Sequence, residues 1–374
     1  MDRVKNKIGV VTGIYPPDIG GPATYIPKLA DFLLKKGNYV SLLTLGAENN
    51  RLSSTDQNFI SIKRDQNKIM RMTRTIFEVG KITSYCQQIF ANGLFEEVAI
   101  SKLLFRNRKF IGKIVGDPIW ERFRNKTNQN VSIEIFNTPE FKIPLIYRLQ
   151  RKLLVWSLNK FDNLTTPSSQ LKEMIERWGV RKPIQVITNG VICSNPYSGQ
   201  KEYDVVTVSR LTNWKNIDLV INACSEIGLS LAIVGDGPEM SQLKKLAATA
   251  NASIKFFGEL DQEGVSQVLR ESCIYILFSN YEGLSFSLLE AMMFGKPVIV
   301  SDVPGNRDVI EHGVTGLVVP VNSHQKLVEA LRYLAEHPEL ANSLGNKAHK
   351  VAKNKFCIEK NLDRINSLLT EKSK

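Results

Sequence analysis

The sequence contains no apolar run long enough to cross a membrane as a helix. Its longest runs, Leu153–Leu158 and Ile274–Phe278, fall far short of the roughly 20 residues that a spanning helix needs. The N-terminus has basic residues before a short apolar run, but it lacks the small-residue cleavage site of a signal peptide. We therefore expect a first strand at this end and a cytoplasmic protein.

Cysteine is scarce and follows no pattern. The sequence has five cysteines, an odd number, and no CxxC pair. This usage is typical of reduced thiols in a cytosol and argues against a zinc site. The five residues are Cys86, Cys193, Cys224, Cys273 and Cys357.

Two further absences limit the chemistry. No DxD sequence occurs, so no obvious carboxylate pair is available to carry a metal-bound nucleotide. All four histidines lie in the second half of the chain, which excludes a histidine general base from the first half. No Ser/His/Asp or Cys/His triad is apparent. The histidines are His312, His324, His337 and His349.

Charge is plentiful but uneven. The net charge of +12 belongs to the residues up to Gly190, which carry 30 Lys and Arg against 16 Asp and Glu, whereas the remainder carries 19 against 21. So basic a half suits a polyanionic partner or an anionic membrane surface, and a merely solvated surface is the alternative. The 43% hydrophobic content is otherwise that of a globular protein, and 374 residues suit two domains.

The order of the predicted elements indicates parallel α/β sheets. The strand Lys7–Thr12, a Pro/Gly-rich loop, the helix Tyr25–Lys36 and the strand Tyr39–Leu45 make a βαβ unit. After a short polar linker, strands and helices alternate again. We therefore predict two doubly wound α/β domains, 1–191 and 192–356.

The middle of the first half is less regular. We predict helices over Lys68–Lys81 and Ser84–Phe90, and a strand over Glu97–Ser101. Pro139–Trp156 is expected to form a basic amphipathic helix. Basic and apolar residues interleave at 106–124, which suits a lipid interface, and a core-facing helix with a solvated face is the alternative.

The most informative stretch runs from Ser279 to Pro320. Within it, Ser285–Met293 is almost wholly apolar and is predicted to be a short helix, on which the carboxylate of Glu290 needs solvent, a partner or a ligand. Glu282 and Gly283 stand just before the helix, where a backbone can approach a ligand and free N–H groups attract an anion. Two carboxylates so placed suit hydroxyls on either side of a bound phosphate. A structural loop with Glu290 on a solvated face is the alternative.

Two cations precede this stretch. Arg210 and Lys215 follow directly on a predicted strand, where a parallel sheet would hold a diphosphate. Cations near a helix start oppose its dipole, which favours a bound anion over two unrelated surface residues. Gly20–Gly21, after the first strand of the chain, is a weaker phosphate signal because it matches neither GxGxxG nor a Walker loop.

Taken together, these motifs resemble those of the retaining GT-B glycosyltransferases of family four. The strongest element is the pair Glu282 and Glu290, which are separated by seven residues within NYEGLSFSLLEAMMFGKP. VSRLTNWK, VGDGPE, FFGEL and YPPDIGGPATY follow the family's order, so the match covers nearly the whole chain. The resemblance implies two Rossmann-like doubly wound parallel-sheet domains that face a central cleft, with the last helix, about 357–374, packing back on the first domain.

The resemblance also implies an activity. A hexose would pass from a nucleotide-diphosphate sugar to a glycan or a polyprenyl- or other lipid-linked acceptor, with retention at the anomeric carbon, in surface polysaccharide or glycolipid biosynthesis. Neither a cofactor nor a metal would be needed. The basic first domain would suit peripheral contact with an anionic membrane at the inner face of the cell membrane, and no nucleic-acid partner is expected.

The family's site residues carry over onto matching positions. Arg210 and Lys215 would neutralise the diphosphate leaving group as the glycosidic bond breaks. Glu282 would hold hydroxyls of the donor sugar, and Glu290 would hold the ribose. The other donor contacts would be Gly20, Gly21, Gly258, Glu259, Leu260, Gly283, Leu284, Ser285 and Phe286.

One departure from the family concerns the first domain. Many members have a His-Asp pair there, and this sequence has Gly116-Asp117. Asp117 would then take a catalytic role near the acceptor, and a helix-capping Asp is the alternative. Two other functions stay open: a nucleotide-sugar epimerase or hydrolase on the same fold, and a non-catalytic basic module that binds nucleic acid, for which no recognised motif is present.

Overall fold

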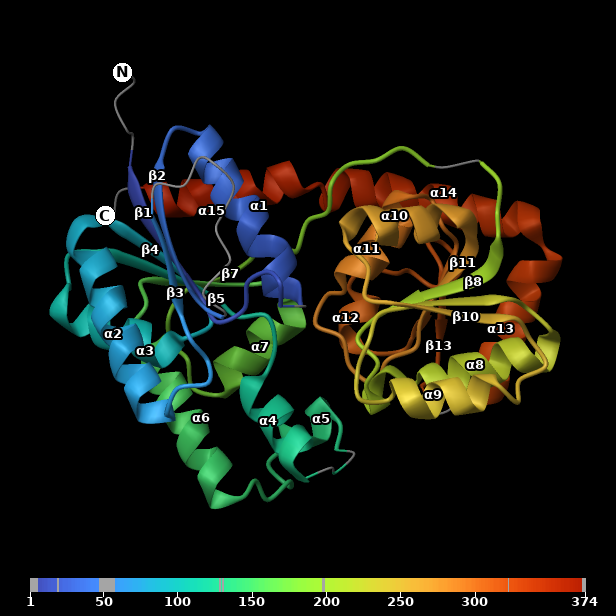
Figure 1. Ribbon diagram of the computed structural model, residues 1–374, viewed down its shortest axis with the longest axis horizontal. Helices are drawn as coiled ribbons and strands as arrows, with labels where there is room; N and C mark the ends of the chain where they lie inside the picture. The colour runs from blue at the N-terminus through green and yellow to red at the C-terminus, as the bar shows by residue number, and fades with distance from the viewer. Residues whose placement is uncertain are drawn as a thin grey trace. The chain divides into compact units, whose positions relative to one another are not determined.

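The chain divides into two compact units. The structure is a computed structural model that describes residues 6–18, 20–46, 58–127, 129, 131–196, 199–321 and 323–371. Unit 1 comprises residues 1–129, 134–188 and 360–374, and unit 2 comprises residues 130–133 and 189–359 (Figure 1).

Unit 1 is built on a parallel sheet with the strand order β3-β2-β1-β4-β5-β6-β7. The order reverses between β1 and β4, and ligands of open α/β sheets bind outside the carboxyl ends of the strands at such a point. The strands are β1 (Lys7–Thr12), β2 (Tyr39–Leu45), β3 (Asn58–Ile62), β4 (Gln88–Asn92), β5 (Lys109–Lys113), β6 (Asn163–Thr166) and β7 (Ile184–Val186).

Helices cover this sheet because their apolar stripes need a partner. Helix α1 packs on β1 and β2, α2 packs on β1, β2 and β3, and α3 contacts both α2 and α6. The helices are α1 (Gly21–Lys35), α2 (Lys68–Tyr85), α3 (Phe95–Leu104), α4 (Pro118–Thr127), α5 (Ile133–Phe136), α6 (Leu145–Leu158) and α7 (Ser169–Arg177). Among the described residues, none of the helices has the length and apolar character to cross a bilayer.

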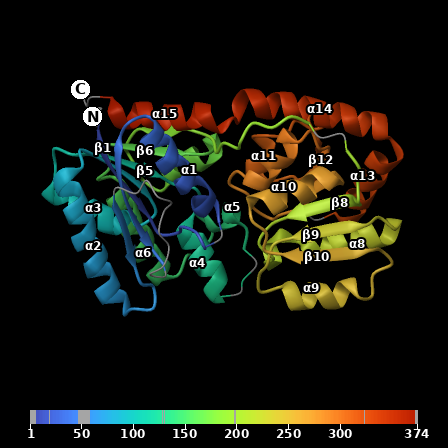
Figure 2. The same cartoon turned by 45° about the horizontal axis from the view of Figure 1, so that its top comes forward.

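The last helix, α15 (Ile358–Thr370), returns to unit 1, beside α1 and β1 (Figure 2). Asn361 donates to the carbonyl of Thr188, and Arg364 donates to the carbonyl of Val186 at the end of β7. Its buried side chains, Leu362, Ile365 and Leu369 among them, recur at helical spacing. Residues at both ends of the sequence therefore build unit 1.

Unit 2 repeats the same topology. Its parallel sheet has the order β10-β9-β8-β11-β12-β13, which reverses between β8 and β11. The strands are β8 (Tyr203–Val208), β9 (Leu231–Val234), β10 (Ile254–Gly258), β11 (Ser272–Leu277), β12 (Val298–Ser301) and β13 (Leu317–Val319). The helices are α8 (Ile217–Ile227), α9 (Met240–Ala247), α10 (Gln262–Glu271), α11 (Phe286–Met293), α12 (Pro304–Arg307), α13 (His324–Glu336) and α14 (Pro338–Lys355), with the short 3-10 helix η1 (Asn213–Lys215).

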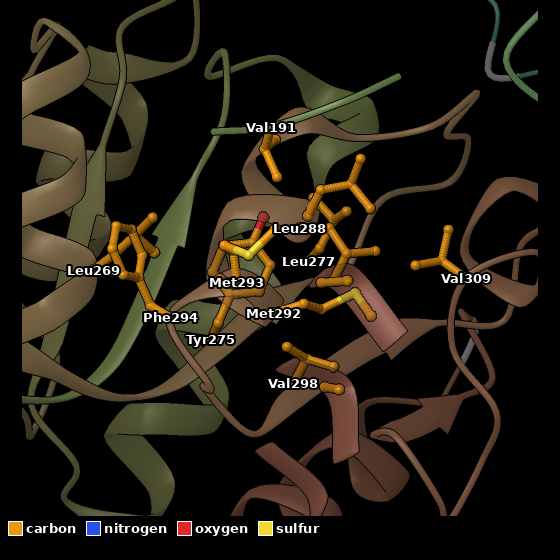
Figure 3. Close-up of a cluster of buried hydrophobic side chains, with 14 of the residues drawn as sticks. Val191, Leu269, Tyr275, Leu277, Leu288, Met292, Met293, Phe294, Val298 and Val309 are labelled. Atoms are coloured by element: carbon orange, nitrogen blue, oxygen red, sulfur yellow. The ribbon is translucent and has the colours of Figure 1, made fainter. Parts of the chain in front are cut away.

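The core of unit 2 surrounds α11, the apolar helix that the sequence predicts. Leu288, Leu289 and Met292 are fully buried and pack with Tyr275 and Val298 of the sheet (Figure 3). Each such side chain contributes about 1.5–3 kcal/mol by leaving water. This burial fixes α11, and with it the loop that carries Glu282.

Two predicted elements of unit 1 are wrong. Ser84–Phe90 was expected to be a helix and Glu97–Ser101 a strand, but residues 88–92 form β4 and residues 95–104 form α3. Strand β4 lies inside the sheet and is buried on both faces, so it lacks the alternation that marks a strand. Short apolar runs do not reveal their type by periodicity. The helix expected from Pro139 begins only at Leu145. A proline disfavours helical geometry in the residue before it, and Pro144 stands directly before the first turn of the helix.

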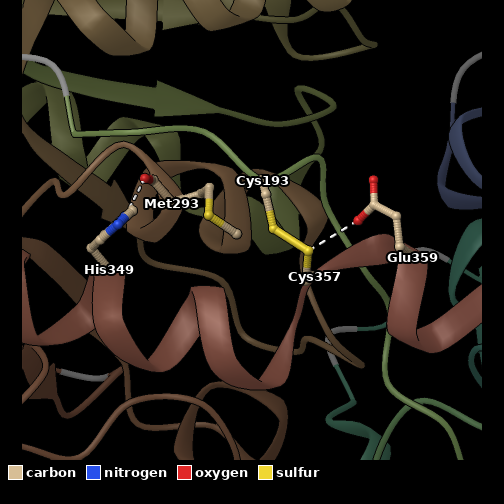
Figure 4. The surroundings of a disulfide bond; sticks show 5 residues. All are labelled: Cys193, Met293, His349, Cys357 and Glu359. Atoms are coloured by element: carbon tan, nitrogen blue, oxygen red, sulfur yellow. Dashed lines mark hydrogen bonds between the residues drawn. A yellow bond between two sulfur atoms is a disulfide. The ribbon is translucent and has the colours of Figure 1, made fainter.

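The expectation of reduced thiols throughout is wrong for one pair. Cys193 and Cys357 form a disulfide across a sequence separation of 164 residues (Figure 4). Backbone hydrogen bonds already join these segments. Val191 donates its N–H to the carbonyl of Phe356, and Ile358 donates its N–H to the carbonyl of Val191. The spacing of cysteines in the sequence does not reveal a disulfide whose two residues only the fold brings together. The free cysteines in the described chain are Cys86, Cys224 and Cys273.

Candidate active site

The candidate site of unit 2 lies at the reversal of its strand order. The loop after β8 carries Arg210 and Lys215, and the loop after β11 carries Glu282. Because β8 and β11 are neighbours in the sheet, their carboxyl-end loops meet there. The two segments are about seventy residues apart in sequence, and the sheet brings them together.

Lys215 and Glu282 form the central contact. Lys215 Nζ lies 2.5 Å from Glu282 Oε1, and the Ser279 hydroxyl donates to the same oxygen at 2.6 Å. The side chains of the pair are only 16% and 9% exposed. Charges so little solvated interact more strongly than a surface pair. An ammonium and a carboxylate are therefore held ready at the strand ends.

Backbone contacts hold the two loops in register. Asn280 donates its N–H to the carbonyl of Trp214, and the Asn216 side chain donates to Asn280 and to the carbonyl of Phe278. Asn216 adopts the left-handed conformation at φ 50°, which asparagine tolerates better than most residues. The position of Lys215 beside Glu282 is thus determined by main-chain geometry and does not depend on the ion pair alone.

Glycine is required where α12 meets this loop. A Cβ on Gly305 would lie 2.2 Å from the carbonyl oxygen of Glu282 and 2.6 Å from that of Gly283. No real side chain has room there. Gly305 lets α12 press directly on the loop, which sets the position of the Glu282 backbone.

The glycine loop after β9 supports the segment that carries Arg210. A Cβ on Gly235 would lie 2.0 Å from the carbonyl oxygen of Ser209, and one on Gly237 would lie 2.3 Å from that of Leu211. The geometry of this loop is that of a close backbone support. The Arg210 side chain is exposed, and no ion-pair partner for it appears in the described part of the chain.

The FFGEL loop lies next to this support. Gly235 donates its N–H to the carbonyl of Gly258 at 2.7 Å, which ties the end of β10 to the end of β9. Gly258 has φ +67°, in the region that favours glycine. Glu259 is exposed and Leu260 is half-buried. The predicted base-binding loop therefore lies at the same edge of the sheet as Arg210.

Helix α11 begins directly at the site. Ser285 is its N-cap and accepts the N–H of Leu288, while Ser287 donates to the carbonyl of Val208 at the end of β8. Gly283 and Phe286 are half-buried at this start, and Leu284 is buried. Glu290, one turn on, is half-buried, and Gln262 of α10 donates to it at 2.8 Å. The structure thus solvates and pairs the glutamate that the sequence singled out.

Unit 1 carries the remaining predicted residues. Gly20 has φ +145° and precedes α1, whose first residue is Gly21. Asp117 is fully buried and accepts the N–H groups of Ile119 and Trp120 at the start of α4. This geometry favours the helix-capping alternative for Asp117.

A cation completes the surroundings of Asp117. Arg151 lies 2.7 Å from its second oxygen, and Asn137 also donates to that oxygen. Burial lowers the pKa of Arg151, whereas Asp117 favours its charged form. Every acceptor position of the carboxylate is engaged within unit 1, so Asp117 has a structural task in this state.

Sequence reasoning missed several residues of the site. Ser279, Trp214 and Asn216 hold Glu282 and Lys215 in place, but they carry no motif of their own. Asn189 donates to the carbonyl of Leu284 at 3.0 Å from ninety-five positions away. Only the asparagine after a short 3-10 turn offered a signal, since asparagine is a frequent left-handed residue.

Comparison with known proteins agrees with this geometry. Residues 195–351 match the family model of the glycosyl transferases group 1. The uncharacterized glycosyltransferase MJ1069 of Methanocaldococcus jannaschii is 24% identical over 96% of both chains, and the D-rhamnosyltransferase WbpZ of Pseudomonas aeruginosa is 28% identical over 62% of this chain and 56% of its own. Residues 195–351 of the chain are therefore similar to the glycosyl transferases of group 1.

Comparison with solved structures shows that the fold is GT-B. Sucrose-phosphate synthase from Thermosynechococcus elongatus superposes with a TM-score of 0.80 at 18% identity and covers 97% of this chain and 98% of its own. HepE of Anabaena, in complex with UDP and glucose, superposes with a TM-score of 0.77 at 18% identity over 98% and 99% of the two chains. The predicted α/β class is therefore confirmed.

The family match divides the predicted site residues. Arg210, Lys215, Glu282 and Glu290 lie inside the matched segment, 195–351. Gly20, Gly21 and Asp117 lie outside it. The matched segment therefore contains the candidate site of unit 2.

Proposed function

We propose that this protein is a group 1 glycosyltransferase that moves a hexose from a nucleoside diphosphate sugar to a glycan or lipid-linked acceptor, with retention at the anomeric carbon and without a metal ion. The observation that carries the proposal is the Lys215–Glu282 pair at the strand-order reversal, beside the exposed guanidinium of Arg210. HepE, which shares the fold, has been solved with UDP-glucose. Its donor supports a nucleotide sugar here.

In this proposal the two loops divide the work on the donor. Arg210 and Lys215 stabilise the negative charge that grows on the diphosphate as the glycosidic bond breaks, which favours the transition state over the ground state. Glu282 accepts hydrogen bonds from hydroxyls of the transferred sugar. The N–H groups of Gly283 to Phe286, at the start of α11, add donors to the same anion.

The nucleoside end of the donor falls to neighbouring elements. Glu290 receives the ribose hydroxyls, and the loop Gly258–Leu260 lies beside the base. Gly20 and Gly21, at the start of α1 in unit 1, are proposed as further donor contacts. Asp117, in its capping position, acts on the acceptor only by fixing α4, which follows the loop at Gly116.

Relatives favour a cell-surface product. A relative that is 31% identical over 47% of this chain and 19% of its own is the exopolysaccharide phosphotransferase SCO2592 of Streptomyces coelicolor, and a neighbour in fold, with a TM-score of 0.68, is the lipopolysaccharide outer core galactosyltransferase WaaB. We place this protein in surface polysaccharide or glycolipid biosynthesis, on the cytoplasmic side. A lipid-linked acceptor would require the enzyme to reach a membrane.

Two helices of unit 1 offer a surface for that contact. Helix α6 exposes Leu145, Ile146 and Leu149, and helix α2 exposes Ile69 and Met70, each more than half exposed. Arg148 and Lys152 on α6, and Lys68 and Arg74 on α2, are exposed among them. Apolar side chains that enter the interface and cations that meet anionic headgroups are the features of a membrane-surface helix. We therefore propose peripheral binding through α2 and α6.

Vesicle flotation tests this surface. Vesicles with anionic phospholipid should carry the protein upward, and vesicles of phosphatidylcholine should not. Ile146→Gln with Leu149→Gln should abolish flotation, whereas Leu104→Gln, on an equally exposed leucine of α3, should leave it unchanged. Flotation that ignores the α6 substitutions, or equal binding to both vesicles, would reject the surface.

A donor screen tests the function itself. Thermal-shift measurements across nucleoside diphosphate sugars should identify one donor that raises the Tm, and Lys215→Met should remove the shift. Product analysis without an acceptor separates the alternatives: an epimerase converts the donor and a hydrolase releases free sugar, whereas a transferase leaves most of the donor intact. A mobility shift with DNA or RNA would instead support the binding module.

A further inference from the structure

A row of buried polar side chains crosses the carboxyl edge of the unit 1 sheet. Thr12 of β1 pairs in register with Asn92 of β4, and Lys113 of β5 pairs with Thr165 of β6. The pair Ala91–Gly112 puts Asn92 and Lys113 side by side as well. All four side chains are buried. Thr12 and Asn92 stand at the strand-order reversal, the position that holds ligands in such sheets.

This row points toward α1. A Cβ on Gly9 would meet Ile82 of α2, so Thr12, three residues further along the strand, points to the opposite face. On that face Tyr25 of α1 covers the row, and Lys113 Nζ lies 3.8 Å from the centroid of its ring. Tyr25 is also buried.

Three atoms of this cluster have no hydrogen-bond partner in the described part of the chain. They are Lys113 Nζ, Asn92 Nδ2 and the Tyr25 hydroxyl. An ammonium buried without a partner costs several kcal/mol, and the contact with the Tyr25 ring returns about 2 kcal/mol at most. Burial accordingly lowers the pKa of Lys113 to about 7. The protein on its own leaves the lysine uncompensated.

The missing partner has a definite chemistry. A lysine ammonium and an asparagine amide nitrogen are hydrogen-bond donors only, and a tyrosine hydroxyl donates one hydrogen bond. Several donors around one positive charge suit an oxyanion. Thr12 is already occupied, because its hydroxyl donates to the carbonyl of Ile14.

The loop beside the row carries backbone strain. Gly93 has φ +98°, and Leu94 has φ +51°, a conformation that costs a non-glycine residue of the order of 1–3 kcal/mol. A Cβ on Gly93 would lie 3.6 Å from the backbone N of Gly13 in the loop after β1, so the two loops meet. Such strain concentrates where a loop contacts a ligand.

We propose that Lys113, Asn92 and Tyr25 form an oxyanion site in unit 1 that receives a phosphate group of the acceptor. This inference rests on the proposed transferase function, since it names the class of acceptor as a phosphorylated one. Lys113 is enclosed in this structure, with 1% of its surface exposed. Ligand binding therefore requires the side chains that enclose Lys113 to move.

Calorimetric titration with inorganic diphosphate tests the site. Wild-type protein should show two binding phases, one from Arg210 and Lys215 in unit 2 and one from Lys113 in unit 1. Arg210→Ala should remove the first phase, and Lys113→Met should weaken the second about tenfold or more, since the charge carries most of a charge-assisted contact. Lys35→Met, which removes an exposed lysine of α1, should change neither phase.

A second variant keeps the test independent of packing. Asn92→Asp would place a carboxylate beside Lys113, so it should raise the Tm of the free protein and abolish the second phase. Geranyl diphosphate and glucose 1-phosphate, as competitors, distinguish a lipid-linked phosphate from a soluble one. A second phase that survives Lys113→Met or Asn92→Asp would overturn the site. Wild-type protein that shows only the Lys113 phase would instead count against the donor site of the proposed function.

Discussion

Lys215 Nζ lies 2.5 Å from Glu282 Oε1, across two loops that follow neighbouring strands of the unit 2 sheet. The pair joins a cation suited to a diphosphate and a carboxylate suited to sugar hydroxyls. In the free protein each neutralises the other, and in the donor complex each would gain a substrate partner. The pair therefore costs little to maintain and is ready to separate when the donor binds.

Removal of the Glu282 charge should impair the use of donor. Glu282→Gln keeps the shape of the side chain but weakens its hydrogen bonds to hydroxyls, and a bond to a charged group contributes about 1.5–3 kcal/mol. We expect kcat/KM for the nucleotide sugar to fall about 10- to 100-fold. Glu263→Gln, on the exposed first turn of α10, is the matched control and should keep wild-type kinetics. Unchanged kinetics of Glu282→Gln would remove this residue from the site.

Glu290 should bind the ribose hydroxyls of the nucleoside diphosphate. Glu290→Ala should weaken the binding of a nucleoside diphosphate about tenfold, because a charged hydrogen-bond acceptor is lost, and should leave inorganic diphosphate binding unchanged. Calorimetry with a ribonucleotide and its 2′,3′-dideoxy analogue checks the cause. Wild-type protein should prefer the ribonucleotide, and Glu290→Ala should bind the two alike. A preference that persists in the variant would assign the ribose to another residue.

Gly305 should be intolerant of a side chain. Gly305→Ala would put a Cβ against the carbonyl of Glu282, so the loop must shift, at a cost of about 1–3 kcal/mol in the free energy of unfolding. Donor affinity should fall as well, since Glu282 moves with its loop. Gly80→Ala provides the control: its Cβ meets nothing within 4 Å, and helix propensity favours alanine by up to about 1 kcal/mol. Chemical denaturation measures both variants, and equal stabilities would contradict the packing described.

Lys113 should make stability depend on pH. Burial lowers its pKa to about 7 in the folded protein, against 10.5 for the free side chain. Between these values the unfolded chain binds more protons, so this lysine makes the protein more stable as pH rises through the window. Lys113→Met should therefore raise the Tm most at pH 7 and below, with a gain that shrinks toward pH 10. A gain that is constant with pH would mean that the lysine is not buried as an unpaired amine.

The residues of the candidate site in unit 2 can be singled out from the sequence because their signals are local. Glu282 lies in the loop before α11 and Glu290 lies on that helix, so one short motif contains both. Arg210 and Lys215 both follow β8 and belong to a second short motif. The alternation of strands and helices likewise predicts parallel sheets. The α11 helix was predicted as Ser285–Met293 and is observed as Phe286–Met293, with Ser285 as its cap.

Other features depend on strand register, which one sequence does not encode locally. Lys113 ends an ordinary apolar strand, and only its alignment with Asn92 reveals the polar row. The same holds for the Cys193–Cys357 pair. Strand β4 was predicted as a helix and α3 as a strand, because both elements are short and β4, buried inside the sheet, lacks the alternation that marks a strand.

The central claim is that the protein transfers a sugar with retention and that the Lys215–Glu282 site performs the transfer. Radiolabelled nucleotide sugars should be incubated with lipid-linked and oligosaccharide acceptors, and the anomeric configuration of the product determined by NMR. We predict that label enters an acceptor with the configuration of the donor, and that Glu282→Gln and Lys215→Met nearly abolish this product. An inverted product, or the absence of both transfer and donor hydrolysis across a broad panel, would contradict the claim.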